Sequence, residues 1–213
     1  MYFDWTYIVF GVALFLIVLS RVRFMSALNK SAYACAKGLK AGAIADELIK
    51  NSSIDTVTVR SGEIRAAGRY VPENKTLILS TKVFDNTSVA AVTLAGYEAG
   101  RVIQYERKYF PLLMKKTIAP LINILSWAGL IGTAVSTIMQ IPEFIHWSCL
   151  LFAASVLLSM MMLPPEFDTS YLISLIFKKR AYFDAKEYAH AKRVFGARAF
   201  LLPVLRICNP KSL

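Results

Sequence analysis

Three long stretches of the chain contain no Asp, Glu, Lys or Arg. They span residues 5–20, 117–142 and 144–165. A helix needs roughly 20 apolar residues to cross the hydrocarbon core of a bilayer, and the second and third stretches have that length. The first stretch is shorter, but three apolar or aromatic residues precede Asp4. The pattern therefore predicts three membrane helices, at about 5–22, 118–140 and 146–164, and we interpret the first as an uncleaved anchor.

The region between the first two apolar stretches has a mixed helix and strand pattern. Residues 26–50 predict a helix with a break near the glycines at 38–42. Short β-rich runs at 56–60 and 76–80, separated by a turn-forming segment at 68–74, predict a small antiparallel sheet. Asp, Asn, Thr and Ser at 85–88 then offer N-cap chemistry for a helix that continues to about residue 107.

The charged residues are strongly segregated along the chain. All 25 Lys and Arg fall within 21–116 or 178–211, whereas residues 1–4 and the turn around Glu143 hold two acids and no base. The positive-inside rule then places the 21–116 region and the C-terminus in the cytoplasm. A net charge of +11 would suggest nucleic acid in a soluble protein. Here the membrane orientation explains the surplus, so we expect no nucleic-acid partner.

The composition agrees with a membrane protein. Hydrophobic residues make up 56% of the chain, charged residues 18%, and the mean hydropathy is +0.47. An ordinary soluble domain carries about 25% charged residues. The values exclude an intrinsically disordered chain and a secreted module built on disulfides.

The helix that follows residue 88 carries the most informative side chains. The pairs Ala95-Gly96 and Ala99-Gly100 keep one flank of this helix thin, which allows another element to approach closely. Tyr97 and Arg101 lie four residues apart and share a face, and Glu98 and Arg101 have the spacing of an ion pair. By themselves these residues indicate a packed amphipathic helix with one surface ion pair, worth a few tenths of a kcal/mol.

A comparison of the whole motif with known families adds a second interpretation. Residues 96–104, Gly-Tyr-Glu-Ala-Gly-Arg-Val-Ile-Gln, resemble the His-Glu-x-Gly-His helix of the YugP-type membrane zinc metallopeptidases, also called neutral zinc metallopeptidases. Further along, residues 165–170, Pro-Glu-Phe-Asp-Thr-Ser, are similar to the family's Pro-x-Glu-Phe-Asp-Ala-Ser element. The resemblance covers about residues 1–195 in one order, including a Gly-Leu segment at 38–39, a Tyr-x-Pro turn at 70–72 and a Leu-Ser strand at 79–80.

The resemblance implies zinc-assisted peptide hydrolysis, in which two His of the motif and a later Glu bind the metal. Carried onto this chain, the general base is Glu98 and the later ligand is Glu166. The two histidine positions hold Tyr97 and Arg101. Arginine has no lone pair to donate to zinc, and tyrosine, with a pKa near 10, is a rare ligand. We therefore expect no metal and no cofactor, and a silent Glu98.

The rest of the chain does not replace the missing histidines. His146 lies near the predicted outer tip of the hairpin and His190 on the basic C-terminal segment, and we expect interfacial or solvated side chains at both. Arg69 stands in the turn where family members usually carry Asp-His-Tyr-Asp-Pro.

Positive side chains thus occupy positions around the family's metal site. We predict that Arg101 pairs with Glu166, with Glu98 or Asp168 as a second partner and Tyr97 packed alongside. Alternatively, Arg69 and Arg101 contact an anion.

Together these features predict an α-helical integral membrane protein with a small α+β cytoplasmic domain, in which three transmembrane helices surround a zincin-like motif helix. The predicted parts are an N-terminal anchor at 1–23, the α+β metallopeptidase-like domain at 24–116 with its motif helix at 88–107, a transmembrane hairpin at 117–165 and a basic C-terminal helical segment at 166–213.

For function, the sequence favours a metallopeptidase-like protein without catalysis, a pseudo-peptidase that acts as a scaffold or partner subunit. The alternatives are an active membrane zinc peptidase with unorthodox ligands and a module that binds anionic lipid. The expected partners are the bilayer, anionic lipid head groups, and a membrane protein or a second copy of the chain. The expected location is the bacterial plasma (inner) membrane, with the main domain in the cytoplasm.

Overall fold

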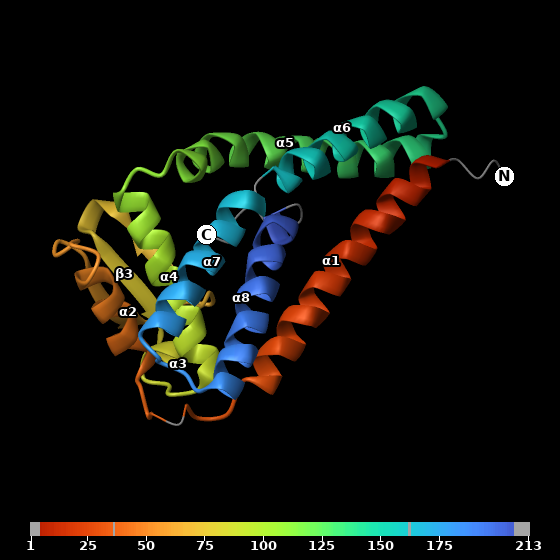
Figure 1. Cartoon of the computed structure of the whole chain (residues 1–213). Coiled ribbons are helices and arrows are strands. Elements are labelled where there is room, and N and C mark those ends of the chain that lie inside the picture. The colour runs from red at the N-terminus through yellow and green to blue at the C-terminus, as the bar shows by residue number, and fades with distance from the viewer. Residues whose placement is uncertain (1–4, 36, 162, 207–213) are drawn as a thin grey trace.

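The structure, a computed structural model, describes residues 5–35, 37–161 and 163–206, and it is mostly helical with one small sheet (Figure 1). Residues 1–4 of the predicted anchor and 207–213 of the predicted C-terminal segment lie outside the described residues. The helices are α1 (Trp5–Lys30), α2 (Ala41–Lys50), α3 (Thr81–Phe84), α4 (Val89–Glu106), α5 (Phe110–Met139), α6 (Pro142–Met160), α7 (Leu163–Lys179) and α8 (Ala185–Arg206), with a 3-10 turn at Pro72–Asn74.

The sheet differs from the antiparallel pair that the sequence predicts. Within the described residues it has three strands in the order β1 (Thr58–Gly62), β3 (Thr76–Ser80), β2 (Gly68–Val71). The two predicted strands pair in parallel, and the predicted turn segment supplies β2, which pairs antiparallel to β3. The 3-10 turn and left-handed Lys75 (φ 44°) close a tight β2–β3 hairpin. Because β2 occupies one edge of β3, β1 pairs with the other edge, where it runs parallel to β3.

The predicted helix at 26–50 is divided between two elements. Its first part continues the N-terminal apolar helix, so that α1 runs without a break from Trp5 to Lys30. The chain then leaves helical geometry until Ala41, and Gly38 adopts a left-handed conformation (φ 60°) in this break. Glycine is the residue that accepts such a φ without steric cost. The glycine-rich break is therefore confirmed, and it lies where α1 ends and α2 begins.

Helix α4 forms the centre of the core, with α7 and α8 packed against it (Figure 1). The predicted thin flank is confirmed. A Cβ at Gly96 would lie 2.5 Å from Cζ of Phe177, and one at Gly100 would lie 2.5 Å from Cγ1 of Ile173. Glycine at these positions lets α7 approach closely enough for Thr169, Ile173 and Phe177, one turn apart from each other, to bury against α4.

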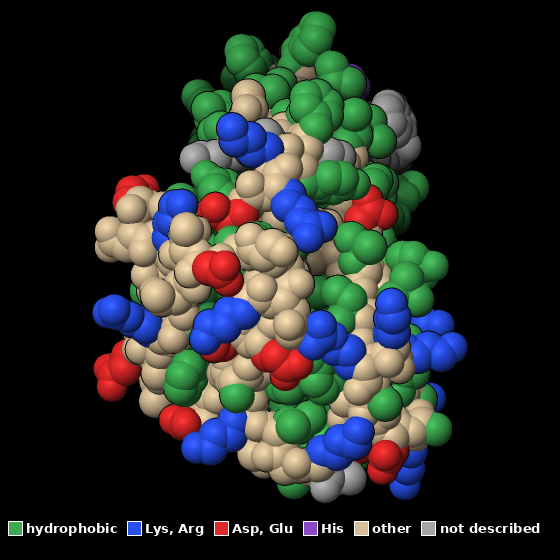
Figure 2. Space-filling model, turned by 60° about the vertical axis from the view of Figure 1, so that its left-hand side comes forward, with side chains coloured by type: hydrophobic (Ala, Val, Ile, Leu, Met, Phe, Trp, Pro, Cys, Tyr) green, Lys and Arg blue, Asp and Glu red, His purple; other side chains and the backbone are tan. Residues whose placement is uncertain are grey.

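The hairpin α5–α6 extends from this core. Two helical stretches are long and apolar enough to cross a membrane among the described residues: Thr117–Met139, and Glu143–Lys179, which includes α6 and continues into α7. Large hydrophobic side chains such as Ile138 and Trp147 are exposed on the hairpin. Figure 2 shows hydrophobic side chains gathered at the upper end of the molecule, whereas Lys, Arg, Asp and Glu are spread over its body. These features indicate a membrane protein; a third span in α1 and the orientation stay predictions.

The predicted orientation can be tested by cysteine labelling. Lys75 is exposed beside the β2–β3 turn, and Glu143 is exposed at the start of α6. In intact cells, Lys75→Cys should not react with a membrane-impermeant maleimide, because positive-inside orientation places it in the cytoplasm. Glu143→Cys, the control, should react. Both variants are made in a background without native cysteines, and labelling of position 75 from outside would contradict the orientation.

Candidate functional site

Helix α4 presents Tyr97, Glu98 and Arg101 from the middle of the core. Its N-terminus is fixed by Ser88, whose hydroxyl accepts a hydrogen bond from the backbone N–H of Ala91 at 3.2 Å. Such an N-cap contributes about 1 kcal/mol to helix stability. Tyr97 and Glu98 are almost completely buried, at 0% and 3% exposure. The motif is therefore a core feature: the predicted pair of Glu98 and Arg101 forms, but it is largely buried instead of lying at the surface.

The carboxylate of Glu98 lies between two guanidinium groups. Nη2 of Arg198 donates to Oε1 at 2.8 Å, and Nη1 of Arg101 donates to Oε2 at 3.2 Å. The Arg198 side chain is nearly as buried as that of Glu98. On the other side, strand β2 covers the carboxylate, since a Cβ on Gly68 would lie 2.8 Å from Cγ of Glu98. Both carboxylate oxygens thus accept charge-assisted hydrogen bonds in a space with restricted access to water.

Tyr97 connects α4 to α7. Its hydroxyl donates a hydrogen bond to Oε2 of Glu166, and both side chains are buried. Burial raises the pKa of the Tyr97 hydroxyl above its ordinary value, and the nearby Arg101 opposes part of that rise. Tyr97 is therefore neutral at physiological pH and acts as a donor. The guanidinium of Arg198 lies 5.9 Å from the centre of the Tyr97 ring, which adds a cation–π contact.

Two further polar contacts join α4 and its C-terminal loop to α7. The hydroxyl of Thr169 donates to Oε1 of Gln104 at 2.6 Å, with both residues buried. The hydroxyl of Tyr109 donates to Oδ2 of Asp168 at 2.7 Å in an exposed position. The Glu-Phe-Asp element thus meets the motif helix, as the resemblance implies.

The structure brings most of the candidate residues together, with a different pairing from the one expected. Arg101 contacts Glu98, which we expected only as a second partner, and the contact shown for Glu166 is with Tyr97. Asp168 contacts Tyr109. Arg69 is exposed on β2, next to Gly68, and successive residues of a strand point to opposite faces. Since Gly68 faces Glu98, Arg69 lies on the other face, and it does not converge with Arg101 on one anion site.

Arg198 is the residue of this site that the sequence interpretation missed. It lies in α8, a hundred residues from Glu98 along the chain. One signal was present. Residues 194–205 contain Arg198 as their single charged side chain, and a lone charge in an apolar helical run indicates a buried partner.

These side chains do not fit the zinc ion that the resemblance implies. Arg101 cannot coordinate a metal, and the two guanidinium groups beside Glu98 would repel a cation. Tyr97 holds its proton, which leaves Glu166 as the one ordinary zinc ligand of the motif. Among the residues that the structure describes, no group of three or more His, Cys, Asp or Glu is arranged to hold a metal. His190 packs edge-on against Tyr33, with ring centres 5.6 Å apart.

The buried ion pair should dominate the stability of this core. Arg198→Met would leave Glu98 with one guanidinium in a buried position, and we expect the free energy of unfolding to fall by about 3–5 kcal/mol. Arg180→Met is a matched control, because Arg180 pairs with Glu47 at the same 2.8 Å but with both side chains partly exposed. That loss should be much smaller, because water screens an exposed pair and solvates either partner once the other is removed. Equal losses in denaturant unfolding of the detergent-solubilised protein would contradict the prediction.

The tyrosine–carboxylate contacts offer a second matched pair. Tyr97→Phe removes the buried hydroxyl donor to Glu166 and should lower the free energy of unfolding by about 1–3 kcal/mol. Tyr109→Phe removes the same kind of hydrogen bond, to Asp168, at the surface, where water replaces the donor. We expect a change within about 0.5 kcal/mol for this control. A Tyr97→Phe protein as stable as the wild type would show that the buried contact contributes nothing.

The sequence resembles known proteins over most of its length. The sequence profile of a family described as "Putative neutral zinc metallopeptidase" matches residues 6–201. A protein of Bacillus subtilis (strain 168) named "Putative membrane protease YugP" is 25% identical over 130 residues. That alignment covers 61% of this chain and 58% of the relative's length. No solved structure matches the chain. Because the profile extends over most of the sequence, from α1 to α8, the chain belongs to the neutral zinc metallopeptidase family.

Proposed function

We propose that this protein is a pseudo-peptidase of the membrane, a family member that keeps the peptidase-like core without hydrolytic chemistry and acts as a scaffold or partner subunit. The observation that carries the proposal is the state of Glu98. In a zinc peptidase the motif Glu takes a proton from metal-bound water. Here each carboxylate oxygen of Glu98 accepts a hydrogen bond from a guanidinium, so the carboxylate is occupied as the centre of an ion-pair network.

The residues at the two motif histidine positions support a structural role, because each of them contacts a carboxylate of the candidate site. A metal at this position would join α4 to α7 through its ligands. In this chain the hydroxyl of Tyr97 makes that connection directly to Glu166, and Arg198 adds a connection from α8 to Glu98. Arg101 and Arg198 supply positive charge where a zinc ion would otherwise neutralise carboxylates. A guanidinium provides that charge permanently and without Lewis acidity.

The proposed location is the bacterial plasma membrane, with the α+β part in the cytoplasm. The apolar hairpin α5–α6 supports insertion into a bilayer, and the confinement of Lys and Arg to the segments outside the apolar stretches supports the cytoplasmic side. A scaffold at this surface would act by contact with another membrane protein or with a second copy of the chain.

Metal content and proteolysis of the purified full chain test the proposal. We expect no stoichiometric zinc after purification without chelators, and no cleavage of an unstructured substrate such as casein. Glu98→Gln should reduce stability through the loss of charge beside Arg198, with no change in hydrolysis. Proteolysis that is abolished both by a chelator and by Glu98→Gln would contradict the proposal and favour an active peptidase with unorthodox ligands.

A variant in which both histidines of the family's motif are restored provides the positive control. The double change Tyr97→His and Arg101→His places two imidazoles four residues apart on α4, with Glu166 opposite, which is a three-ligand arrangement suited to catalytic zinc. We expect this variant to bind zinc in a dialysis experiment in which the wild type does not. Equal zinc uptake by both proteins would show that the metal binds elsewhere or that Tyr97 and Arg101 do not prevent binding.

A further inference from the structure

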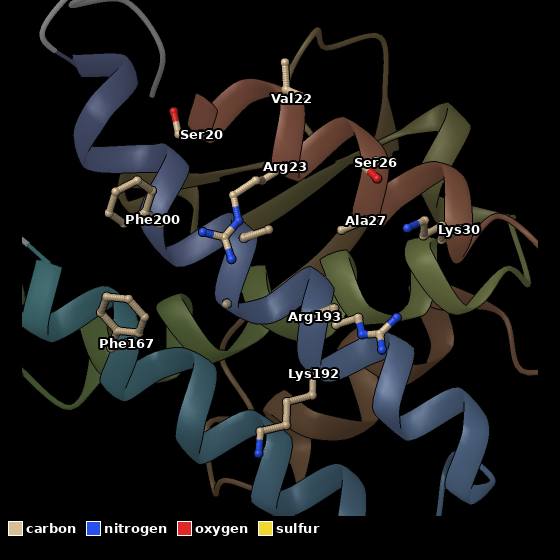
Figure 3. A pocket seen from close by; sticks show the side chains of 12 residues that line it. Ser20, Val22, Arg23, Ser26, Ala27, Lys30, Phe167, Lys192, Arg193 and Phe200 are labelled. Atoms are coloured by element: carbon tan, nitrogen blue, oxygen red, sulfur yellow. The ribbon is translucent and has the colours of Figure 1, made fainter. Parts of the chain in front are cut away.

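A cavity of about 670 Å³ is lined by residues of α1, α7 and α8 (Figure 3). Its size is in the range of pockets that hold small organic molecules. None of its lining residues belongs to the ion-pair network around Glu98. The cavity is therefore a separate feature, and binding of a ligand there does not depend on whether the protein hydrolyses peptides.

The charged residues that line the cavity are all basic. Arg23 and Lys30 come from α1, Lys192 and Arg193 come from α8, and no Asp or Glu among the described residues lines the cavity. In the part of the chain that the structure describes, none of these four side chains has an ion-pair or hydrogen-bond partner. Unbalanced positive charges around one hollow repel one another and raise the local concentration of anions. Two arginines in the set can donate bidentate hydrogen bonds, the geometry that suits phosphate.

The opposite end of the cavity is aromatic. Figure 3 shows Phe167 of α7 and Phe200 of α8 on one side, Arg23 in the middle, and Arg193 and Lys30 on the other side. The aromatic end also carries Ser20, the last residue of the charge-free stretch of α1. The cavity is therefore amphipathic. Its aromatic end lies beside the charge-free stretch of α1, and its basic end lies farther toward the C-terminus of that helix. That order matches a phospholipid, whose phosphate lies outside its hydrocarbon chains.

Gly196 provides an independent observation on the wall of the same cavity. It lies inside α8, where glycine destabilises a helix relative to alanine. Nothing lies within 4 Å of a Cβ built on it. Gly96 and Gly100 of α4, in contrast, are required because α7 packs directly on them. Neither packing nor backbone conformation requires glycine at 196, and its effect is to leave the cavity open.

Exposed apolar side chains continue outward from the cavity. On α1, Val18 and Val22 are more than half exposed, lie one turn apart and precede Arg23 on the side of the charge-free stretch. On α7, Phe167, which lines the aromatic end of the cavity, is itself exposed. These side chains lie at the aromatic end of the cavity, and hydrocarbon chains would lie against them.

From this combination we infer that the cavity between α1, α7 and α8 is a binding site for an anionic phospholipid. The phosphate lies among Arg23, Lys192 and Arg193, and the acyl chains pass Phe167 and the exposed valines of α1 toward the charge-free stretch. The group that the basic side chains recognise is a phosphate ester. A phospholipid and a soluble phosphate ester share this group and differ in the hydrocarbon chains of the lipid. The apolar side chains at the aromatic end of the cavity favour the lipid.

Titration of the detergent-solubilised full chain, followed by native mass spectrometry, tests the site. The probes are dioleoyl phosphatidylglycerol, the zwitterionic dioleoyl phosphatidylcholine, and soluble glycerol 3-phosphate. We expect phosphatidylglycerol to bind more tightly than either of the others. The double change Arg23→Gln and Arg193→Gln should weaken phosphatidylglycerol binding roughly 25-fold, about fivefold for each charge removed.

The matched control removes two charges from another place. Lys178 and Lys179 are exposed at the end of α7 and do not line the cavity. The double change Lys178→Gln and Lys179→Gln should alter the affinity less than about twofold, because these charges lie outside the site. Equal losses for the two double variants would mean a diffuse attraction to the basic surface and would overturn the site.

Changes at Gly196 test the cavity without altering charge. Gly196→Ala should retain phosphatidylglycerol binding, whereas the larger Gly196→Leu should fill the cavity and weaken binding at least tenfold. Thermal unfolding without lipid checks that each variant is folded, and none of the changed side chains has a partner whose loss would destabilise the protein. Binding of phosphatidylcholine as tight as that of phosphatidylglycerol would overturn the inference. Glycerol 3-phosphate binding as tightly as the lipid would overturn the lipid assignment in favour of a soluble phosphate ester.

Discussion

The buried carboxylate of Glu98 is the constraint on which the core of this protein depends. A carboxylate removed from water destabilises a fold strongly unless it is paired and hydrogen-bonded. Helix α4 carries Glu98 into the centre of the core, strand β2 closes over it through Gly68, and α8 brings Arg198 to within 2.8 Å. Arg101 completes the pairing from the next turn of α4. The packing of α4, β2 and α8 against one another thus depends on the buried charge of Glu98.

The same helix is held to α7 by close packing and by hydrogen bonds. Gly96 and Gly100 allow the side chains of α7 to pack against the α4 backbone. At that short separation the Tyr97 hydroxyl reaches Glu166. In a zinc-binding relative, a shared metal would provide this connection through its ligands. The glycine packing accommodates either solution, which gives a physical reason why a metallopeptidase-like fold can persist with a tyrosine and an arginine at the two histidine positions.

Helix α8 has two different environments for its positive charges. On its inner side Arg198 is buried, paired with Glu98 and stacked near the rings of Tyr97 and Phe24. On its outer side Lys192 and Arg193 face a cavity with no acidic lining. The inner charge is neutralised within the fold, whereas the outer charges require a counterion from outside. This difference separates a structural use of arginine in the core from the proposed recognition of lipid phosphate at the surface.

Local pattern in the sequence determined several features of this protein. The charge-free stretches predicted the hairpin, the N-cap run predicted α4 to within a residue at each end, and the small residues at 95–96 and 99–100 predicted its thin flank. The motif resemblance identified the family and the meeting of α4 with the Glu-Phe-Asp element. These features follow from the periodicity, composition and side-chain volume of neighbouring residues, so they can be inferred from the sequence alone.

Only the tertiary structure decided which groups pair. Arg198 reaches Glu98 across a hundred residues, and its approach depends on how α8 packs against α4, which local pattern does not encode. The position of β1 in the sheet likewise depends on the β2–β3 hairpin, which occupies the other edge of β3. The basic cavity needs α1 and α8, from the two ends of the chain, to lie side by side. In each case the outcome depends on contacts between residues that are far apart in the sequence. Those contacts form only when the helices and strands pack together.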